Sequence, residues 1–284
     1  MRIYLNGELL PREEARVSVF DRGFLYGDGV FETLRAYAGV IFRCREHVER
    51  LLQSAEAIRL SIPQTPEALE TALNDTLRAN NLKEARIRIT VTRGEGEPGM
   101  MDSVSTPPTV CIVATPFAGP PPEKFRDGIR ADIASVRQIP PQVLPPSAKS
   151  LNRLPLILSR MEIAGTGAEE ALMLTLEGFV AEGTMSNVFL VKAGKVITPP
   201  LSLGILDGIT RREVLQLASA SGIPWAEEGF GPEAFGGAAE SFLTSTTFEV
   251  MPLVNVGGTP IGEGVPGPVT RRLQESFHYI SRSP

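Results

Sequence analysis

Cysteine and histidine are scarce in this sequence, with two of each among 284 residues. Cys44 and Cys111 form no CxxC pair, so neither a disulfide framework nor a thiolate metal site is expected. His47 and His278 lie far apart, and neither has another ligand residue at a metal-binding spacing. We therefore expect no metal site.

Long apolar runs and dense basic clusters are also missing. The sequence has no stretch of about 20 apolar residues, and polar Asn6, Gly7 and Glu8 interrupt the start before a signal-peptide core can form. The net charge is -5 and no Lys/Arg run occurs, unlike the basic patches of nucleic-acid binders. These features predict a cytoplasmic protein without a membrane or nucleic-acid partner.

The residues that are present predict a folded protein of mixed α and β structure. Hydrophobic residues make up 42% and charged residues 21%, as in ordinary globular proteins, and the length allows two domains. The hydrophobic patterns predict helices near 45–60, 209–221 and 267–280, and strands near 85–92, 109–114, 170–176, 179–191 and 239–244.

Two proline-rich stretches punctuate the chain. The first, at 116–122, restricts φ and lacks backbone donors, so we expect it to interrupt helix or sheet and to form a linker between domains. The second, at 140–146, ends just before Lys149, and apolar residues then recur with helical period up to Gly165. Lys149 is thus expected on a loop at the start of a helix.

The GxGxxG pattern at 94–99 does not indicate a dinucleotide site. Gly94, Gly96 and Gly99 satisfy GxGxxG after a predicted strand, but prolines follow instead of a helix. Without helix N-terminal amides the motif cannot hold a pyrophosphate. A plain turn is expected there.

Lys149 is one of five lysines, and alone it would be read as an exposed loop residue. Four further motif segments occur in the same chain and give Lys149 its significance, namely 46–51 (EHVERL), 181–189 (AEGTMSNVF), 204–212 (GILDGITRR) and 244–249 (TSTTFE). With 149–154 (KSLNRL), these segments resemble the class IV (fold type IV) pyridoxal-5'-phosphate (PLP) aminotransferases. That family includes branched-chain and D-amino acid aminotransferases and 4-amino-4-deoxychorismate lyase, and the resemblance runs from Tyr4 to about Pro252.

The resemblance implies a fold and an assembly. It implies a two-domain α/β fold like that of D-amino acid aminotransferase, with a smaller domain at 1–117, a linker at 118–125 and a larger domain at 126–284 that carries the PLP lysine. PLP is expected at the domain interface, with pyridoxamine phosphate (PMP) formed in the half-reaction. The family also implies a homodimer in which each subunit lends residues to its partner's site.

The resemblance assigns the two catalytic residues. Lys149 would form the Schiff base with PLP and move the proton, as a lysine of suppressed charge can. Glu182 would keep the pyridine nitrogen protonated, because a buried carboxylate favours a charged partner. Without the motif, Glu182 would be read as a surface carboxylate at the start of a strand.

The remaining cofactor residues follow from the same segments. A phosphate suits the start of a helix, where backbone amides are free to donate, and Gly208, Ile209 and Thr210 open a predicted helix. In the family this segment, Ser245 and Thr246 of the later loop, and Arg50 hold the cofactor, with Leu206 near the ring. By itself Arg50 would be an exposed helix residue paired with Glu46.

The substrate side departs from the family patterns. By the resemblance, Phe31, within 20–35 (FDRGFLYGDGVFETLR), would line the pocket for the substrate side chain. The alternative interpretation of this segment is a Gly-rich turn between two strands. The Thr247 amide would lie near the substrate carboxylate. D-amino acid aminotransferases bind the substrate carboxylate with an RxH pair, but the matching positions here are Pro98 and Met100. Branched-chain enzymes have a YxR pattern, in which Arg86 here takes the place of the tyrosine. Arg88 or Arg22 could take over carboxylate binding.

These departures leave the substrate open. We expect transfer of an amino group between an amino acid, either a D-amino acid or a branched-chain L-amino acid, and a 2-keto acid. 4-Amino-4-deoxychorismate lyase is the alternative, because both reactions use the same lysine. A non-catalytic PLP-binding homologue is the remote third reading.

Overall fold

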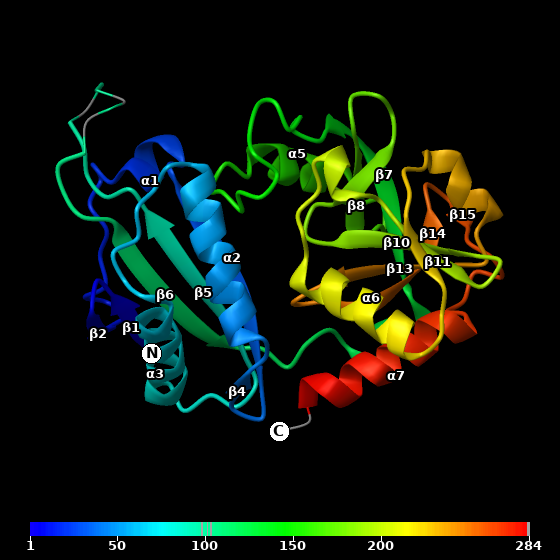
Figure 1. The fold of residues 1–284 in the computed structure, drawn as a ribbon, viewed down its shortest axis with the longest axis horizontal. Coiled ribbons are helices and arrows are strands. Elements are labelled where there is room, and N and C mark those ends of the chain that lie inside the picture. The colour runs from blue at the N-terminus through cyan, green and yellow to red at the C-terminus, as the bar shows by residue number, and fades with distance from the viewer. Residues whose placement is uncertain (98, 101, 103, 283–284) are drawn as a thin grey trace. The chain divides into compact units, whose positions relative to one another are not determined.

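The computed structural model describes residues 1–97, 99, 100, 102 and 104–282. The chain forms two compact units (Figure 1). The N-terminal unit consists of Met1–Ala118 and Ser147–Asn152, and the C-terminal unit consists of Gly119–Pro146 and the chain from Arg153 onward. Both combine sheets with helices, as the mixed α/β sequence pattern predicts.

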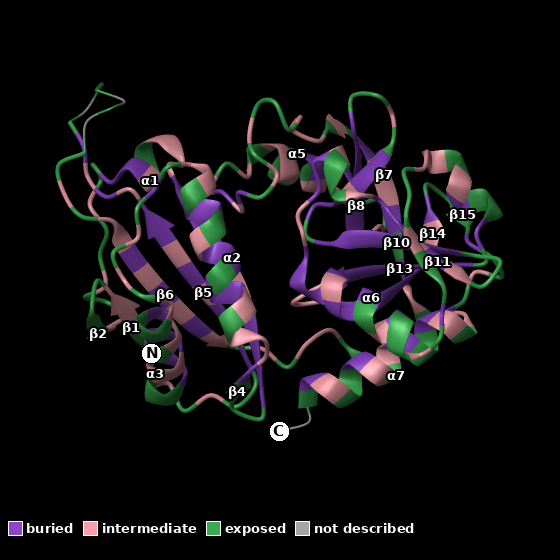
Figure 2. Ribbon diagram, in the orientation of Figure 1, coloured by how far each residue is buried: buried purple, intermediate pink, exposed green. Residues whose placement is uncertain are grey.

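The N-terminal unit contains an antiparallel sheet in the order β2-β1-β6-β5-β3-β4. Its strands are β1 (Arg2–Leu5), β2 (Glu8–Pro11), β3 (Gly29–Tyr37), β4 (Val40–Ile41), β5 (Ala85–Thr92) and β6 (Thr109–Pro116). Isoleucine and valine alternate with polar residues along β5, so only one face of this strand is fully buried (Figure 2). The central pair β3 and β5 runs in register from Gly29 opposite Thr92 to Ala36 opposite Ala85.

Two amphipathic helices pack on this sheet, and a short one precedes β3. They are α1 (Arg22–Tyr26), α2 (Cys44–Ala57) and α3 (Pro66–Ala79). Thr65 caps α3 by accepting a hydrogen bond from the Ala68 amide, and Pro66 occupies the first helical position, where its missing N–H costs nothing. Val48, Leu51 and Ala55 of α2 pack into one apolar core with residues of α3, β3, β5 and β6.

The C-terminal unit contains a mixed sheet in the order β12-β11-β10-β13-β14-β7-β8-β9, with β15 beside β14. Its strands are β7 (Ile129–Arg137), β8 (Glu170–Leu174), β9 (Val180–Gly183), β10 (Asn187–Lys192), β11 (Lys195–Thr198), β12 (Trp225–Glu227), β13 (Glu240–Ser245), β14 (Glu249–Val256) and β15 (Thr259–Pro260). The β14–β7 and β7–β8 pairs are parallel. Its helices are α4 (Pro122–Asp127), α5 (Leu154–Glu162), α6 (Ile209–Ala220) and α7 (Pro268–Arg282). Among the described residues, no helix combines the length and the apolar character needed to cross a membrane.

Three expectations about these elements need correction. The linker expected at 118–125 is partly helical, because Pro122 begins α4 at a position that tolerates proline. The strand expected at 179–191 is two strands, β9 and β10, separated by a turn. The segment 147–152, expected in the larger C-terminal domain, groups with the N-terminal unit, for a reason seen in the hydrogen bonds around Lys149.

Candidate functional site

Lys149 is fixed by backbone pairing with the start of β3. The Phe31 amide donates to the Lys149 carbonyl at 3.0 Å, and the Leu151 amide donates to the Gly29 carbonyl at 2.9 Å. Val30 and Ser150 form an isolated antiparallel bridge between these bonds. The lysine therefore extends the N-terminal sheet locally, which explains why its segment belongs to that unit.

The start of β3 leaves no space for a side chain beside this pairing. A Cβ on Gly29 would lie 2.5 Å from the Val91 carbonyl oxygen and 2.8 Å from the Leu151 side chain. Glycine is required there because the Lys149 segment and β5 approach the same backbone. The Gly-rich part of the sequence thus ends in a strand, β3, which the sequence pattern did not predict.

Beneath this segment, Glu32 binds two side chains of α2. Arg50 donates to the two carboxylate oxygens of Glu32 from Nε (2.6 Å) and from a terminal nitrogen (2.9 Å). His47 Nδ1 lies 3.0 Å from Glu32 Oε2. All three side chains are buried. Arg50 is therefore not an exposed helix residue paired with Glu46, whose carboxylate lies 3.3 Å from Arg43 instead.

Burial sets the charges of this triad. Burial alone would raise the pKa of Glu32, but the Arg50 guanidinium and the hydrogen bond of His47 outweigh it and hold that pKa far below its ordinary value. Burial lowers the pKa of His47, against the opposing effect of the hydrogen bond to Glu32. At neutral pH we therefore expect an ionised Glu32, a neutral His47 that donates from Nδ1, and a charged Arg50.

This charge pattern predicts a loss of stability on acidification. Unfolded His47 takes up a proton below about pH 6.5 and unfolded Glu32 below about pH 4.3, while the folded state resists both. The unfolded state then binds more protons, so the free energy of unfolding falls as pH decreases, by up to about 1.4 kcal/mol per pH unit for each group. Denaturant unfolding at pH 7.5 and pH 5.5 measures the decrease.

Two histidine variants make this test specific. His47→Asn retains a donor for Glu32 but has no titrating ring, so the loss between pH 7.5 and pH 5.5 is expected to shrink. His278→Asn, at an exposed position of α7, is the matched control and should keep the wild-type pH dependence. An unchanged slope in His47→Asn would show that another group causes the loss.

Two predicted substrate residues lie beside Lys149. Lys149 Nζ is 5.0 Å from the centre of the Phe31 ring, and the Arg88 guanidinium carbon is 3.9 Å from the same centre. Arg88 also donates from Nε to Thr90 Oγ1 at 3.1 Å. Attraction of the Arg88 guanidinium to the electron-rich ring face favours its position over Phe31. The structure thus brings together Lys149, Phe31 and Arg88.

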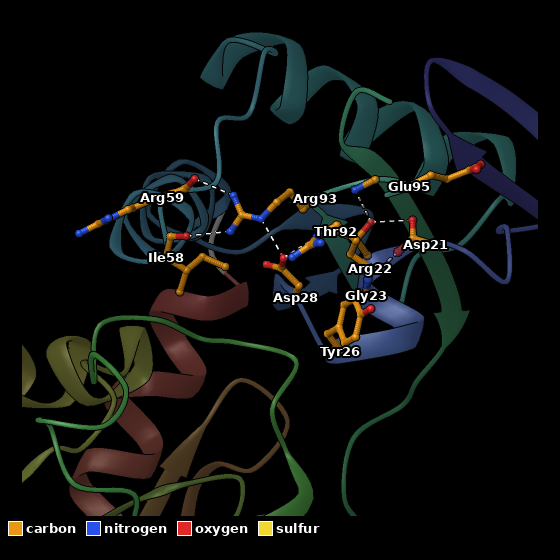
Figure 3. Close-up of polar contacts among 12 residues, drawn as sticks. Asp21, Arg22, Gly23, Tyr26, Asp28, Ile58, Arg59, Thr92, Arg93 and Glu95 are labelled. Carbon is orange, nitrogen blue, oxygen red and sulfur yellow. Dashed lines mark hydrogen bonds and ion pairs between the residues drawn. The ribbon is translucent and has the colours of Figure 1, made fainter. Parts of the chain in front are cut away.

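Arg22, the other candidate for carboxylate binding, belongs to a separate ion-pair network (Figure 3). Its Nε lies 2.9 Å from Asp28 Oδ2, which also accepts from Arg93 at 2.8 Å. Arg93 in turn donates to the Ile58 and Arg59 carbonyls, just beyond α2. The Asp28 carboxylate therefore links α1 to the end of α2, and it holds the Arg22 guanidinium away from a free role in substrate binding.

Of the two positions compared with the RxH pair, Pro98 lies outside the described residues. Met100 is exposed, and its carbonyl oxygen accepts from Arg22 at 3.3 Å. Met100 follows Gly99, which lies in a turn, Glu95 forms an isolated bridge with Asp21, and no described residue from 93 to 100 is helical.

In the C-terminal unit, Glu182 accepts hydrogen bonds from three neutral donors. Gln138 Nε2 donates to Glu182 Oε1 at 3.0 Å. Asn187 Nδ2 (3.3 Å) and the Leu206 amide (3.1 Å) donate to Oε2. Gln138 and Asn187 also bind the carbonyls of Gly204 and Leu206. The carboxylate at the end of β9 is thereby fixed to the loop that precedes α6.

A second carboxylate, Glu170, shapes the turn between β9 and β10. It has no exposed surface and accepts hydrogen bonds from Thr184, Met185 and Ser186. Arg153 donates to the Thr184 carbonyl at 3.0 Å. This turn splits the expected long strand and returns the chain so that Asn187 reaches Glu182.

The start of α6 retains the features of an anion site. Gly208 is the N-cap residue, and among the described side chains none caps this end. A Cβ on Gly208 would collide with Asn187 Oδ1. Buried Ile209 and Thr210 supply the first helical amides, whose dipoles favour a negative charge.

The third segment of this unit is the turn between β13 and β14. The Phe248 amide donates to Ser245 Oγ at 3.0 Å, and Ser245 Oγ lies 3.4 Å from Thr247 Oγ1. Glu249, which follows, has a φ of 56°, a left-handed conformation that sharpens the turn. Hydroxyl groups of Ser245, Thr246 and Thr247 are thus presented together by one turn.

The family follows from comparison with known sequences. The sequence model of the family described as "Amino-transferase class IV" matches residues 29–256, a region that contains every predicted site residue except Arg22. The chain belongs to the class IV aminotransferases. A Methanocaldococcus jannaschii protein, named provisionally as a branched-chain-amino-acid aminotransferase, is 44% identical over 99% of this chain and 96% of its own length.

Other relatives of this class IV aminotransferase carry two kinds of name. The D-alanine aminotransferase of Staphylococcus haemolyticus is 38% identical, with 99% of both chains covered. Among solved structures, a branched-chain amino acid aminotransferase with pyridoxamine 5'-phosphate superposes with a TM-score of 0.95 at 35% identity, covering 100% of this chain and 95% of that chain. The branched-chain aminotransferase of the archaeon Thermoproteus uzoniensis with norvaline has a TM-score of 0.93 at 36% identity, covering 99% of this chain and 95% of that chain. These similarities confirm the family and the fold expected from the motifs.

Several residues of this aminotransferase site were missed by the sequence reasoning. Glu32 and His47 lay within quoted motifs without a role, and Gln138 and Glu170 were outside all of them. A buried acid is difficult to recognise when its partners are distant in the chain, as Glu32 is from Arg50.

Proposed function

We propose that this class IV aminotransferase transfers an amino group between an amino acid and a 2-keto acid with PLP as cofactor and Lys149 as its covalent attachment. The observation that carries the proposal is the pairing of the Lys149 backbone with the start of β3, which places Lys149 beside Phe31 and Arg88 in the unit that also holds the buried Glu32–Arg50 pair. The named relatives are aminotransferases, which disfavours the lyase reading and the non-catalytic one.

The residues present fit PLP and its amine form. The uncapped α6 N-terminus with its obligatory Gly208 suits a phosphate, and the oriented Glu182 carboxylate suits a protonated ring nitrogen. When bound, the cofactor supplies a carbonyl carbon that takes up the amino group and an electron-withdrawing ring that weakens the bond from Cα to hydrogen. The N-terminus of α6 and Glu182 therefore suit the phosphate and the ring nitrogen of one PLP molecule.

Lys149 has two tasks in this proposal. Its amine would bind the cofactor covalently, and when the amine is free, Nζ would accept the proton from the substrate Cα and donate it to the cofactor carbon that is bonded to the same nitrogen. Arg88 and Arg50 lie in the same unit as Lys149. Backbone hydrogen bonds to the start of β3 fix the part of the chain from which Nζ extends.

Glu182 keeps the ring nitrogen protonated. Gln138, Asn187 and the Leu206 amide orient its carboxylate without a formal charge of their own. The negative charge can then stabilise a pyridinium. Leu206, whose backbone bonds to both Asn187 and Glu182, is assigned to the cofactor ring in this proposal.

Phosphate binding is assigned to Gly208, Ile209 and Thr210 at the start of α6, to Ser245 and Thr246 of the β13–β14 turn, and to Arg50. Glu32 grips Arg50 by Nε and one terminal nitrogen, which fixes the plane of the guanidinium. A guanidinium of fixed plane meets a phosphate with little loss of side-chain entropy. The Arg50 guanidinium and the hydrogen bond of His47 hold the pKa of Glu32 low, so Glu32 keeps the negative charge that attracts Arg50.

Substrate binding is assigned to Phe31, Arg88 and Thr247. The Phe31 ring offers an apolar surface to a substrate side chain, and Arg88 above it offers a partner for a carboxylate. The Thr247 amide belongs to the β13–β14 turn and is the second carboxylate donor in this proposal. Arg22 is not retained, because Asp28 and the Met100 carbonyl hold it.

A homodimer is part of the proposal. Helix α5 exposes apolar side chains at positions i, i+3, i+4 and i+7, a stripe formed by Leu154, Ile157, Leu158 and Met161. Contiguous apolar surface of this kind marks an interaction site more often than a solvated face. A second copy of the chain is the partner that the family resemblance implies.

A half-reaction assay tests the function and the donor. PLP-loaded protein mixed with a single amino acid should convert the cofactor to PMP, which is followed by its absorption and by release of the keto acid. Conversion by L-leucine and L-glutamate would make it a branched-chain enzyme, and conversion by D-alanine and D-glutamate alone a D-amino acid enzyme. No conversion by any of the four, together with pyruvate release from aminodeoxychorismate, would overturn the transaminase proposal.

A further inference from the structure

Ser54 of α2 connects the helix that carries Arg50 to the segment that carries Lys149. Its side chain has no exposed surface. Ser54 Oγ accepts a hydrogen bond from the Lys149 amide at 3.1 Å, and it lies 3.0 Å from the Ser147 carbonyl and 2.8 Å from the Arg50 carbonyl, to which it can donate. One hydroxyl therefore contacts the backbone of both functional segments.

The contacts of Ser54 complete the restraint of the Lys149 backbone. The Phe31 amide already holds the Lys149 carbonyl, and Ser54 holds the amide on the other side of the same residue. The hydroxyl has a single hydrogen, which it shares between two carbonyls, so its acceptor role toward Lys149 is always available. Between Ser147 and Lys149, it grips a short turn that the Ser150 amide closes on the Ala148 carbonyl at 2.8 Å.

We propose that Ser54 is a positioning residue that sets the distance between the Lys149 amine and the Arg50 guanidinium. This role rests on the proposed function, because it concerns the cofactor that both residues would hold. A cofactor fixed at one end by a covalent bond and at the other by a phosphate contact is bound tightly only if those two groups are prealigned. A helix serine bonded only to its own helix would have no such effect.

The protein contains that matched control. Ser159 of α5 is also fully buried, and its hydroxyl donates to the Pro155 carbonyl four residues earlier at 2.9 Å. The change Ser→Ala removes the same group from the same kind of site at both positions. The two differ in that Ser54 also contacts the Lys149 segment.

The experiment compares Ser54→Ala, Ser159→Ala and the wild type in two measurements. Amide hydrogen exchange of the apoprotein is expected to speed up about fivefold at 147–151 in Ser54→Ala, the factor for loss of one hydrogen bond of about 1 kcal/mol. The dissociation constant of PLP, measured by equilibrium dialysis, should rise by a similar factor. Ser159→Ala should change neither.

The outcomes separate positioning from general stability. Faster exchange throughout β3 and β5 in Ser54→Ala would mean that the hydroxyl only stabilises the fold, and it would overturn the proposal. The same follows if Ser54→Ala and Ser159→Ala behave alike in both measurements. Failure of the wild-type protein to bind PLP or to transaminate would instead contradict the proposed function, while the exchange result needs no cofactor.

Discussion

Lys149→Ala is expected to abolish transamination, with a fall in kcat of at least about 10⁴-fold, because one side chain both binds the cofactor and moves the proton. The visible absorption of the lysine-bound cofactor should disappear as well. The fold should persist, since the bonds of residue 149 to Phe31 and Ser54 involve its backbone, which alanine retains. Single-turnover kinetics and the absorption spectrum of the PLP-loaded variant measure both effects.

Lys192→Ala is the matched control for this experiment. Lys192 lies at the exposed end of β10, and its loss should leave kcat and the spectrum unchanged. Circular dichroism of both variants establishes that they are folded. A Lys149→Ala protein that transaminates at the wild-type rate would exclude Lys149 as the attachment site.

Glu182→Gln is expected to bind PLP but to lower kcat by about 10²-fold, the usual effect of removing one oriented electrostatic group. Glutamine retains the size of the side chain, and with its oxygen toward Asn187 and the Leu206 amide it can still accept from both, although its amide nitrogen cannot accept from Gln138. The missing charge would lower the pKa of the cofactor ring nitrogen and thereby weaken the electron withdrawal that the proton transfer requires. The ¹⁵N chemical shift of labelled PLP reports the protonation of that nitrogen directly.

The control for Glu182 is Glu177→Gln, at an exposed position in the turn between β8 and β9. It should retain the wild-type ¹⁵N shift and kcat. A Glu182→Gln protein in which the ring nitrogen is still fully protonated would contradict the role given to Glu182. A lower kcat with an unchanged ¹⁵N shift would indicate that the carboxylate acts on the geometry of the site.

The elements predicted from sequence were those with a regular hydrophobic period. Helices α2, α6 and α7 and strands β5 and β13 lie within a few residues of their predicted positions, because each buries one face against a core and the pattern records this. Strand β3 was missed because both of its faces are buried and its start is rich in glycine. Such a strand has no alternation to detect.

Short sequence motifs predicted the site residues, whereas only the structure revealed their hydrogen-bond partners. Lys149, Glu182 and Thr210 were named from motifs, and nothing in the sequence connects Glu32 with Arg50, which are 18 residues apart in the chain. Helical spacing pointed to Glu46 as the partner of Arg50, but β3 places a buried carboxylate closer. Local pairing rules fail where a neighbouring strand competes for the same guanidinium.

The sequence by itself determined the family, the chemical class and the residue expected to bind the cofactor, because the motifs that indicate them are short contiguous stretches of the chain. The tertiary structure decided how those side chains are held: Lys149 by β3 and Ser54, Arg50 by Glu32, and Glu182 by Gln138 and the Leu206 loop. The physical reason is that hydrogen bonds between buried groups join residues far apart in the chain. Their donors and acceptors meet only after the strands and helices have packed.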